Sequence, residues 1–232
     1  MLMDPKHIAI VLDGNRRYAR KLGLKAWKGH EFGAEKVEQL IGWCRDLGVK
    51  ELTLYSFSID NFKRPEAEKK ALFSLFKKYM AKLEKDQRIK KDGIRMSFIG
   101  RLEMFPKDMQ ESMKRAMEKS KSNKNFRLNF AMAYSGKAEI TDSIKRIINK
   151  INNKKLKIDD IDEKLINDHL YLGSEPDILI RPGGEKRLSD FLLWQSAYSE
   201  LFFLDKLWPE MEKEDIKGIM EEFRKRERRF GK

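Results

Sequence analysis

The chain has 232 residues, of which 41% are hydrophobic and 38% are charged, and this fits a single globular domain over residues 1–232. Its net charge of +13 favours anionic partners: nucleic acid, acidic lipid headgroups or phosphorylated small molecules. The single cysteine, Cys44, excludes an intramolecular disulfide, and with only three histidines it argues against a structural zinc site. Cys44 lies in an apolar-periodic stretch, which predicts a buried structural thiol.

No apolar run in the sequence approaches the roughly 18 residues of a membrane-spanning helix. The first ten residues, MLMDPKHIAI, lack the pattern of a secretion signal. We therefore expect a cytoplasmic protein whose contact with membranes, where it occurs, is peripheral.

Short apolar runs alternate with longer segments of helical periodicity. In chain order we predict a strand at His7–Leu12, a helix at Gly33–Leu47 that stops at Gly48, a strand at Glu51–Ser56, a helix at Glu66–Lys91, a strand at Ile94–Ile99, a helix at Lys107–Lys121, a strand at Phe126–Ala133, a helix at Lys137–Asn149, a charged linker at Asn152–Lys157, a helix at Ile161–His169, strands at Asp177–Ile180 and Glu200–Leu204, and a basic helix and tail at Glu212–Phe230. This alternation predicts an α/β fold with a central parallel six-stranded sheet flanked by helices.

The first polar motif, Asp13-Gly14-Asn15-Arg16-Arg17, follows the first predicted strand, where open parallel sheets bind their ligands. Gly14 permits a tight turn, and backbone N–H groups at the start of the next helix favour an anion. The two arginines add charge-assisted contacts to phosphate oxygens. Asp13 fits such a site if Mg²⁺ bridges it to the phosphates. An ordinary Asp-Gly-Asn turn with a helix cap is the alternative.

Two further motifs lie before and after the second predicted strand. One contains Lys25, Lys28, Gly29 and His30. A histidine at a helix start can hydrogen-bond a phosphate, although a capping or surface histidine gives the same pattern. The other, Ser58-Ile59-Asp60-Asn61-Phe62-Lys63-Arg64-Pro65, combines small polar groups, an aromatic ring and cations in what could also be a simple turn.

The fourth motif, RPGGEKRLS, follows the fifth predicted strand. Arg181 and Arg187 flank a Gly-Gly turn, and Ser189 follows two residues later. Forked donors, a flexible backbone and a hydroxyl suit a diphosphate, with a basic surface loop as the alternative. Taken alone, Glu200 and the tail Arg224–Lys232 are typical of solvated charges.

Four strings occur in one order: HIAIVLDGNRRYA, LTLYSFSIDNFKRP, DILIRPGGEKRLSDFLLWQSAYSELFF and RERRFG. Together they resemble the cis-prenyltransferase family, which includes undecaprenyl diphosphate synthase and dehydrodolichyl diphosphate synthase, from His7 to Gly231. The resemblance implies a homodimeric transferase with a hydrophobic tunnel beside its sheet. Its Mg²⁺-dependent reaction would add isopentenyl diphosphate repeatedly to an allylic diphosphate, farnesyl or geranylgeranyl diphosphate. The long-chain polyprenyl diphosphate formed would be the precursor of a glycosyl carrier lipid.

The resemblance also implies roles for individual residues. Asp13 would hold Mg²⁺, assisted by Glu200, which would also serve the dimer interface. Residues binding the allylic diphosphate would be Gly14, Asn15, Arg17 and His30, with Arg16 and Lys25 as further phosphate contacts. Residues lining the reaction centre would be Ser58, Asn61, Phe62 and Arg64, and the proton step could involve Ser58, Asn61 or a diphosphate oxygen. Residues binding isopentenyl diphosphate would be Arg181, Arg187 and Ser189, with Arg229 and Gly231 of the tail reaching the partner's site.

Some positions depart from the bacterial pattern of the family. Ala26 stands where many bacterial members carry an arginine, so Lys25 or Lys28 would have to supply that phosphate contact. Arg16, Tyr18 and Phe62 look more like archaeal and eukaryotic members. The growing chain would need an apolar channel, for which the inner faces of Glu66–Lys91 and the Met-rich Lys107–Lys121 are candidates, with ordinary core packing as the alternative.

Three other functions are each suggested by part of the sequence. A non-catalytic partner subunit would usually lose the Asp-Gly-Asn motif and the loop after the second strand, whereas this chain keeps both. A nucleic-acid-binding protein is suggested by the charge, but no RNA-recognition aromatic motif or clear helix-turn-helix is present. A phosphotransferase or phosphatase using Asp13 is the third alternative, but the chain contains no Walker-type GxxxxGK(S/T) loop. We therefore expect diphosphate substrates and no nucleic-acid partner.

Overall fold

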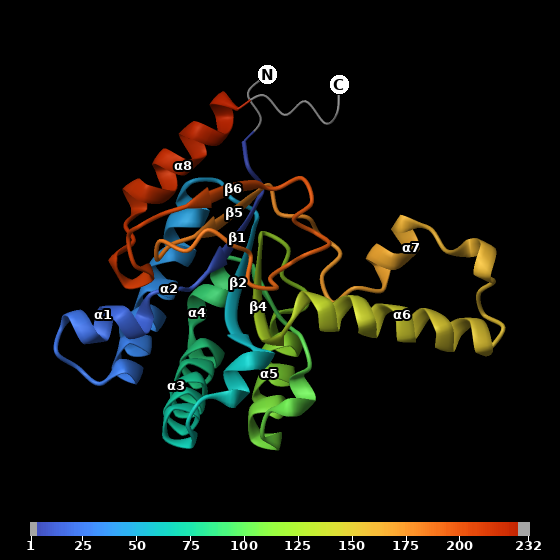
Figure 1. Ribbon diagram of the computed structural model, residues 1–232, viewed down its shortest axis with the longest axis horizontal. Helices are drawn as coiled ribbons and strands as arrows, with labels where there is room; N and C mark the ends of the chain where they lie inside the picture. The colour runs from blue at the N-terminus through green and yellow to red at the C-terminus, as the bar shows by residue number, and fades with distance from the viewer. Residues whose placement is uncertain (1–3, 227–232) are drawn as a thin grey trace.

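The computed structural model describes residues 4–226. Its elements, drawn in Figure 1, are β1 (His7–Val11), α1 (Asn15–Lys21), η1 (Ala26–Lys28), α2 (Gly29–Asp46), β2 (Glu51–Ser58), η2 (Ile59–Lys63), α3 (Glu66–Lys85), α4 (Gln87–Lys91), β3 (Ile94–Ile99), η3 (Leu102–Met104), α5 (Lys107–Ser120), β4 (Phe126–Tyr134), α6 (Gly136–Asn152), η4 (Ile158–Asp160), α7 (Glu163–Asp168), β5 (Ile178–Arg181), β6 (Glu200–Phe203), η5 (Trp208–Glu210) and α8 (Lys213–Lys225).

The six strands form one sheet in the order β3-β4-β2-β1-β5-β6, and every neighbouring pair is parallel. This confirms the predicted α/β fold. Parallel strands are joined by crossovers that cover the sheet, so their residues are apolar and buried; all five residues of β1 are buried. Because the strands are parallel, all six carboxyl ends meet at one edge of the sheet.

The strand order reverses at β1, which lies between β2 and β5. From β1 the chain builds one half of the sheet, and it later returns to the other side of β1 as β5. A crevice forms at such a reversal, outside the carboxyl ends of the two diverging strands. Asp13 follows the end of β1, and Arg181 ends β5. The topology therefore places these two residues side by side, although 168 positions separate them in sequence.

Two apolar clusters cover the two faces of the sheet. The larger one packs α2, α3, α5 and α8 on one face, through residues such as Leu40, Leu72, Met113 and Ile216. On the other face, Leu172, Phe191 and Leu192 from connecting segments pack against the strands. Figure 1 shows α6 and α7 extending to one side of the sheet, while α3 and α5 lie together below it.

The helix predicted at Gly33–Leu47 begins four residues earlier, at Gly29, and ends at Asp46. Gly48 adopts a φ of +83°, as the predicted helix stop requires. Cys44 is fully buried in this helix, and burial raises the pKa of its thiol to about 12. The prediction of a buried structural thiol is therefore confirmed.

The single helix predicted at Glu66–Lys91 is wrong. Helix α3 ends at Lys85, Asp86 is extended at φ −73° and ψ 109°, and α4 starts at Gln87. The Asp86 carboxylate accepts a hydrogen bond from the backbone nitrogen of Arg88 at 2.9 Å, so it caps a new helix instead of continuing the old one.

The helix predicted at Ile161–His169 is shorter in the structure. Asp162 caps α7 by accepting the Leu165 backbone N–H at 2.6 Å, and the helix runs only over Glu163–Asp168. Helix α8 runs over Lys213–Lys225 and is followed by Arg226, and residues 227–230 of the predicted Glu212–Phe230 segment lie outside the described residues. Between residues 4 and 226, no helix has the length and apolar character needed to cross a bilayer.

Candidate active site

The turn after β1 is fixed by backbone contacts to η5. The Asp13 carbonyl accepts the Trp208 N–H at 2.9 Å. Gly14 has a φ of +106°, and a Cβ at this position would lie 2.9 Å from the Cβ of Leu207. Both the conformation and the close approach therefore require glycine here. The side chain of Asn15 donates to the Leu12 carbonyl at 2.9 Å, so it holds the same turn from inside.

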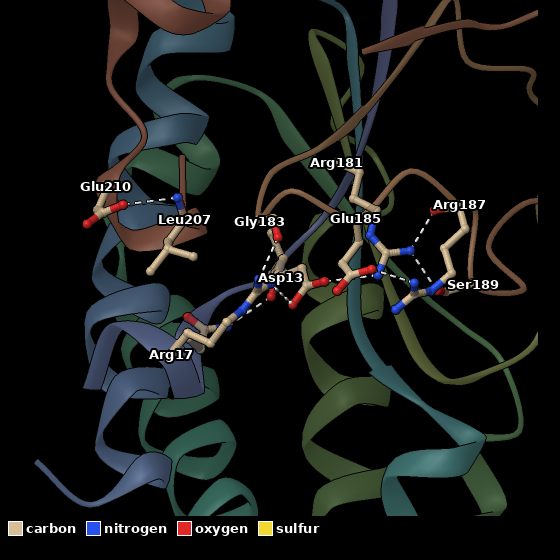
Figure 2. A network of polar contacts seen from close by, with 11 residues as sticks. Asp13, Arg17, Arg181, Gly183, Glu185, Arg187, Ser189, Leu207 and Glu210 are labelled. Carbon is tan, nitrogen blue, oxygen red and sulfur yellow. Dashed lines mark hydrogen bonds and ion pairs between the residues drawn. The ribbon is translucent and has the colours of Figure 1, made fainter. Parts of the chain in front are cut away.

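Asp13 lies between two guanidinium groups (Figure 2). Arg181 donates to one carboxylate oxygen at 2.9 Å, and Arg17 reaches the other at 3.2 Å. The Arg181 side chain is only 4% exposed, whereas that of Asp13 is 29% exposed. The carboxylate thus reaches solvent at the edge of a cationic site, where a small cation could replace one of its arginine contacts.

The loop that follows β5, which carries the RPGGEKRLS motif, contacts the Asp13–Arg17 motif. Arg17 donates to the Gly183 carbonyl at 2.6 Å, and a Cβ on Gly183 would lie 2.6 Å from the Arg17 guanidinium. Arg181 also donates to the Ser189 hydroxyl at 2.6 Å and to the Arg187 carbonyl at 2.5 Å. One buried guanidinium therefore connects Asp13 to the loop that carries Ser189, as Figure 2 shows.

The end of this loop has an unusual backbone. Ser189, Asp190 and Leu192 have φ values of 50°, 64° and 46°, a region that side-chain-bearing residues rarely adopt. The start of α6 holds the loop there. Asp190 accepts the Gly136 N–H with its carbonyl at 2.7 Å and the Lys137 N–H with its carboxylate at 3.0 Å.

A small cavity of about 230 Å³ opens beside Asp13. Its lining combines four arginines with one carboxylate and consists of Leu12, Asp13, Gly14, Asn15, Arg16, Arg17, Arg20, His30 and Arg64. Sequence analysis missed Arg20. It lies four residues after Arg16 and three after Arg17, a spacing that puts it on the same side of a helix. The concentration of guanidinium groups suits a phosphate-bearing ligand.

A buried carboxylate, Glu68, holds the cations of this cavity together. It is 4% exposed and lies 3.1 Å from Arg64 and 3.6 Å from Arg16. Sequence analysis did not identify Glu68 either. The available signal was its position four residues after Arg64, at the start of a predicted helix, where an ion pair is expected.

His30 lies within the same cluster, with its Nε2 3.3 Å from Arg64. Because a guanidinium can only donate, Nε2 must accept, and the ring proton is on Nδ1. Burial, followed by the charges of Arg64 and Arg16, lowers the His30 pKa to about 3. His30 is therefore a neutral hydrogen-bonding group, and Glu68 at 3.9 Å does not form a charged pair with it.

A second, larger cavity of about 420 Å³ continues from the small one. Leu12, Asp13, Asn15, His30 and Arg64 line both. Most of its wall is apolar and comes from α2, α3, α5 and the sheet, including Val37, Ile41, Phe57, Leu72, Leu75, Phe76, Tyr79, Met80, Leu83, Phe98, Met109, Met113, Phe130 and Met132. The inner faces of α3 and α5 thus line a cavity, as predicted for an apolar channel.

Ser58 and Asn61 lie at the polar end of the large cavity, together with Arg181 and Ser189. They form a reciprocal cap around η2. The Ser58 hydroxyl accepts the Asn61 N–H, and the Asn61 side chain accepts the Ser58 N–H, both at 3.2 Å. Their first role is therefore to shape this loop at the cavity mouth.

Four predicted residues do not line either cavity. Lys25 is exposed beside the Trp27 ring, and Arg187 is exposed and paired with Glu185. Phe62 packs within an aromatic cluster, with its ring 5.0 Å from that of Phe57.

Glu200 is the fourth of these residues. Glu200 is the first residue of β6, so it lies at the amino ends of the parallel strands, whereas Asp13 lies at their carboxyl ends. Arg226 pairs with Glu200 at 2.7 Å. Within one chain, the structure does not bring the two proposed metal ligands together. Arg229 and Gly231 lie outside the described residues.

Among residues 4–226, no group of three or more acidic, histidine or cysteine side chains could hold a metal ion. A cage built only from protein ligands is therefore not available in this part of the chain. Asp13 remains as a single carboxylate beside a cationic cavity. That donor set fits Mg²⁺, which commonly binds through one or two carboxylates together with substrate phosphates.

Comparisons with known proteins show what this chain is similar to. The family model described as "Putative undecaprenyl diphosphate synthase" matches residues 11–231. A tritrans,polycis-undecaprenyl-diphosphate synthase (geranylgeranyl-diphosphate specific) from Thermococcus kodakarensis is 46% identical over 230 residues, which cover 98% of this chain and 87% of the relative. The protein of the same name from Methanocaldococcus jannaschii is 43% identical and covers 98% of this chain and 83% of its own.

Two solved structures share the fold. A lavandulyl diphosphate synthase from Lavandula x intermedia, in complex with dimethylallyl diphosphate, matches with a TM-score of 0.92 and 32% identity, covering 99% of both chains. A probable undecaprenyl diphosphate synthase from Campylobacter jejuni matches with a TM-score of 0.82 and 33% identity, covering 99% of this chain and 100% of the other.

Proposed function

This chain belongs to the undecaprenyl diphosphate synthase family of prenyltransferases, and on that basis we propose that it is a Mg²⁺-dependent enzyme that extends geranylgeranyl diphosphate with isopentenyl diphosphate. The primer is proposed from the curated relatives, which are named as geranylgeranyl-diphosphate specific. Farnesyl diphosphate is the alternative primer. The product would be a long-chain polyprenyl diphosphate that serves as precursor of a glycosyl carrier lipid.

One observation carries this proposal: the cationic cavity opens directly into the apolar one. Asp13, Asn15, His30 and Arg64 line both spaces. An allylic diphosphate held by the arginines would therefore have its hydrocarbon tail directed between α3 and the sheet. A molecule with a diphosphate head and a flexible apolar tail satisfies both cavities at once.

The second diphosphate site is proposed at Arg181 and Ser189, across Asp13 from the first. Isopentenyl diphosphate bound there would have its double bond facing the allylic carbon. The allylic carbon–oxygen bond breaks, a carbon–carbon bond forms to the second substrate, and a proton is lost to leave a cis double bond. Holding both substrates side by side supplies much of the rate, since a bimolecular encounter is replaced by a fixed geometry.

The residues of the small cavity would stabilise the leaving group. Arg16, Arg17 and Arg64 are positioned to neutralise the charge that develops on the departing diphosphate. When bound at Asp13, Mg²⁺ would add Lewis-acid stabilisation of the same charge. The proton would be taken by a diphosphate oxygen or through Ser58 or Asn61, whose side chains lie at the cavity mouth.

We also propose a homodimer, because three of the expected roles require a second chain. Glu200 would assist the metal or the interface from the partner, and Arg229 and Gly231 would reach the partner's site. The enzyme would act in the cytoplasm and contact membranes peripherally when the product leaves. Nucleic acid is not expected to bind, since the cationic groups of the site surround a small cavity rather than an extended groove.

The test is incubation of the purified chain with radiolabelled isopentenyl diphosphate and a series of allylic primers, followed by product sizing. We expect long-chain products with geranylgeranyl diphosphate, and loss of product when EDTA removes Mg²⁺. Absence of chain elongation with every primer in the presence of Mg²⁺ would refute the proposal. Equal turnover with and without EDTA would refute only the proposed Mg²⁺ dependence and not the chain elongation itself.

A further inference from the structure

Helix α3 has two contrasting faces. Its inner face contributes Leu72, Leu75, Phe76, Tyr79, Met80 and Leu83 to the wall of the large cavity. On the outer face Lys70, Lys78 and Lys85 are exposed. At 100° per residue these three lysines lie within about 80° of one another around the helix axis. We refer to them as the basic face of α3.

The three lysines have no acidic partner in the part of the chain that the structure describes. Lys70, Lys78 and Lys85 form no ion pair with any residue between 4 and 226, whereas Lys77 and Lys82 of the same helix pair with Asp108 and Glu38. After its first turn, α3 contains only one acid, Glu84, which pairs with Arg115. Positive charge on this face is therefore left uncompensated.

Helices α2 and α5, which contact α3, do not share this pattern. The exposed residues of α5 mix both signs, with Asp108, Glu111 and Glu118 among the basic ones. Exposed positions of α2 include Glu31 and Glu35. A solvated helix in a highly charged protein normally resembles α5, because mixed charges reduce self-repulsion. The basic face of α3 departs from that pattern.

The cavity reaches the surface next to this face. Lys77 lines the cavity, yet its side chain is 47% exposed and pairs with Asp108 of α5. The seam between α3 and α5 is therefore a place where the apolar space lies close to solvent. Figure 1 shows α3 and α5 together at one end of the molecule, away from α6 and α7.

We propose that the basic face of α3 binds the headgroups of an anionic lipid bilayer. The proposal builds on the proposed function, in which the cavity behind α3 holds a growing prenyl chain. Lysines close to an anionic leaflet are attracted to it, and the attraction decays within a Debye length. Docking through this face would bring the α3–α5 seam within reach of the lipid phase into which the product must pass.

A nucleic acid fits this face less well. The exposed positions between the lysines are Ser74 and Ala81, so the face offers no aromatic platform for bases. Its three lysines also lie along a single convex helix instead of lining a groove. A fluid surface of negative headgroups requires neither stacking nor a groove.

The test is flotation of the full chain, without substrate, on vesicles of phosphatidylglycerol and phosphatidylcholine at low and physiological salt. A first variant replaces Lys70, Lys78 and Lys85 with Gln, and a second replaces them with Arg. The matched control replaces Lys145, Lys150 and Lys155 with Gln, because these lysines are also exposed and lie on or just after α6. Both Gln triples lower the net charge equally, and none of the six lysines lines either cavity.

We expect the wild-type chain to bind the anionic vesicles, to lose binding as salt rises, and to ignore pure phosphatidylcholine. The α3 Gln triple should bind at least about tenfold more weakly, while the Arg triple and the α6 control retain binding. Equal losses in the two Gln triples, a larger loss in the α6 triple, or no binding by wild type would overturn the proposal. Binding is measured without catalysis, so an inactive chain that still floats would count against the proposed function and not against this surface.

Discussion

Two regions that meet at Asp13 are built in opposite ways. The pocket formed by Arg16, His30 and Arg64 is braced by the buried carboxylate of Glu68, and its residues lie in helices or next to their ends. The loop from Arg181 to Leu192 has no buried acid of its own and instead contains three non-glycine residues at positive φ. Its shape depends on hydrogen bonds to the start of α6.

The difference shows that one anion-binding region is held by charge and the other by backbone conformation. In the pocket, like-charged groups stay together because a counter-charge is buried among them. In the loop, residues keep a left-handed backbone conformation because hydrogen bonds to the neighbouring start of α6 hold them in it. The two regions should therefore fail by different mechanisms and affect different substrates.

The largest effect should come from Asp13, which the two regions share. In Asp13→Asn both arginines lose their carboxylate partner and the proposed Mg²⁺ loses its ligand, so turnover should fall by at least about 1000-fold. Labelled-product assays at saturating substrates measure this, and circular dichroism checks the fold. Asp46→Asn is the control, since Asp46 lies at the far end of α2, is 62% exposed and pairs with Lys213 of α8. Near-normal turnover of Asp13→Asn with Mg²⁺ would contradict the assignment.

The second prediction distinguishes the two regions by a substitution in the pocket that leaves the loop unchanged. Glu68→Gln removes the counter-charge of Arg64 and Arg16, so these groups should move apart and the KM for the allylic diphosphate should rise by about tenfold or more. The KM for isopentenyl diphosphate should stay within about twofold. Initial-rate kinetics with each substrate varied in turn measure the split.

Glu66→Gln provides a matched control for this variant. Glu66 lies on the same helix two residues earlier, is 77% exposed and pairs with Lys69. It should leave both KM values unchanged. If Glu68→Gln raised both KM values equally, the two regions would be one electrostatic unit, and the comparison would fail.

The third prediction tests the loop. Asp190→Ala removes the carboxylate that accepts the Lys137 N–H and places a residue with little tolerance for positive φ at 64°. We expect the KM for isopentenyl diphosphate to rise by about five- to tenfold, with the allylic KM unchanged, because Ser189 would lose its position. Asp190→Asn should restore most of the affinity, since asparagine tolerates this conformation and can still accept the hydrogen bond. A loss that Asn fails to rescue would mean that the charge, and not the conformation, matters.

The smallest effect concerns the response of the pocket to pH. Because the pKa of His30 is about 3 in the folded chain and near 6.5 ordinarily, the unfolded chain binds the extra proton between these values. The free energy of unfolding should therefore fall as pH drops below 6.5, by up to about 1.4 kcal/mol per pH unit. Denaturant titrations of wild type and His30→Asn at pH 7 and pH 5 measure it. An equal pH dependence in both proteins would show that His30 is not held neutral.

Part of this architecture could be predicted from residue patterns alone. Apolar runs separated by helical periods give the parallel sheet, and glycine, arginine and serine after strand ends give the candidate site. That reasoning placed Asp13, Arg17, Arg181 and Ser189 at or just after strand ends, and the structure has them there, linked by hydrogen bonds through Asp13 and Arg181. The break at Asp86 was not anticipated, because a capping aspartate inside a long helical pattern cannot be distinguished from an exposed one.

By itself, the sequence determined the order of strands and helices and the chemical character of each strand end, because these depend on local periodicity and residue type. Only the tertiary structure decided that β5 lies next to β1, which brings Arg181 into contact with Asp13. It also left Glu200 at the amino ends of the strands, away from Asp13. It also decided that Glu68 faces inward among cations. Such contacts depend on which strands pair and which helix faces are covered, and these are set by burial across the whole chain and not by any local motif.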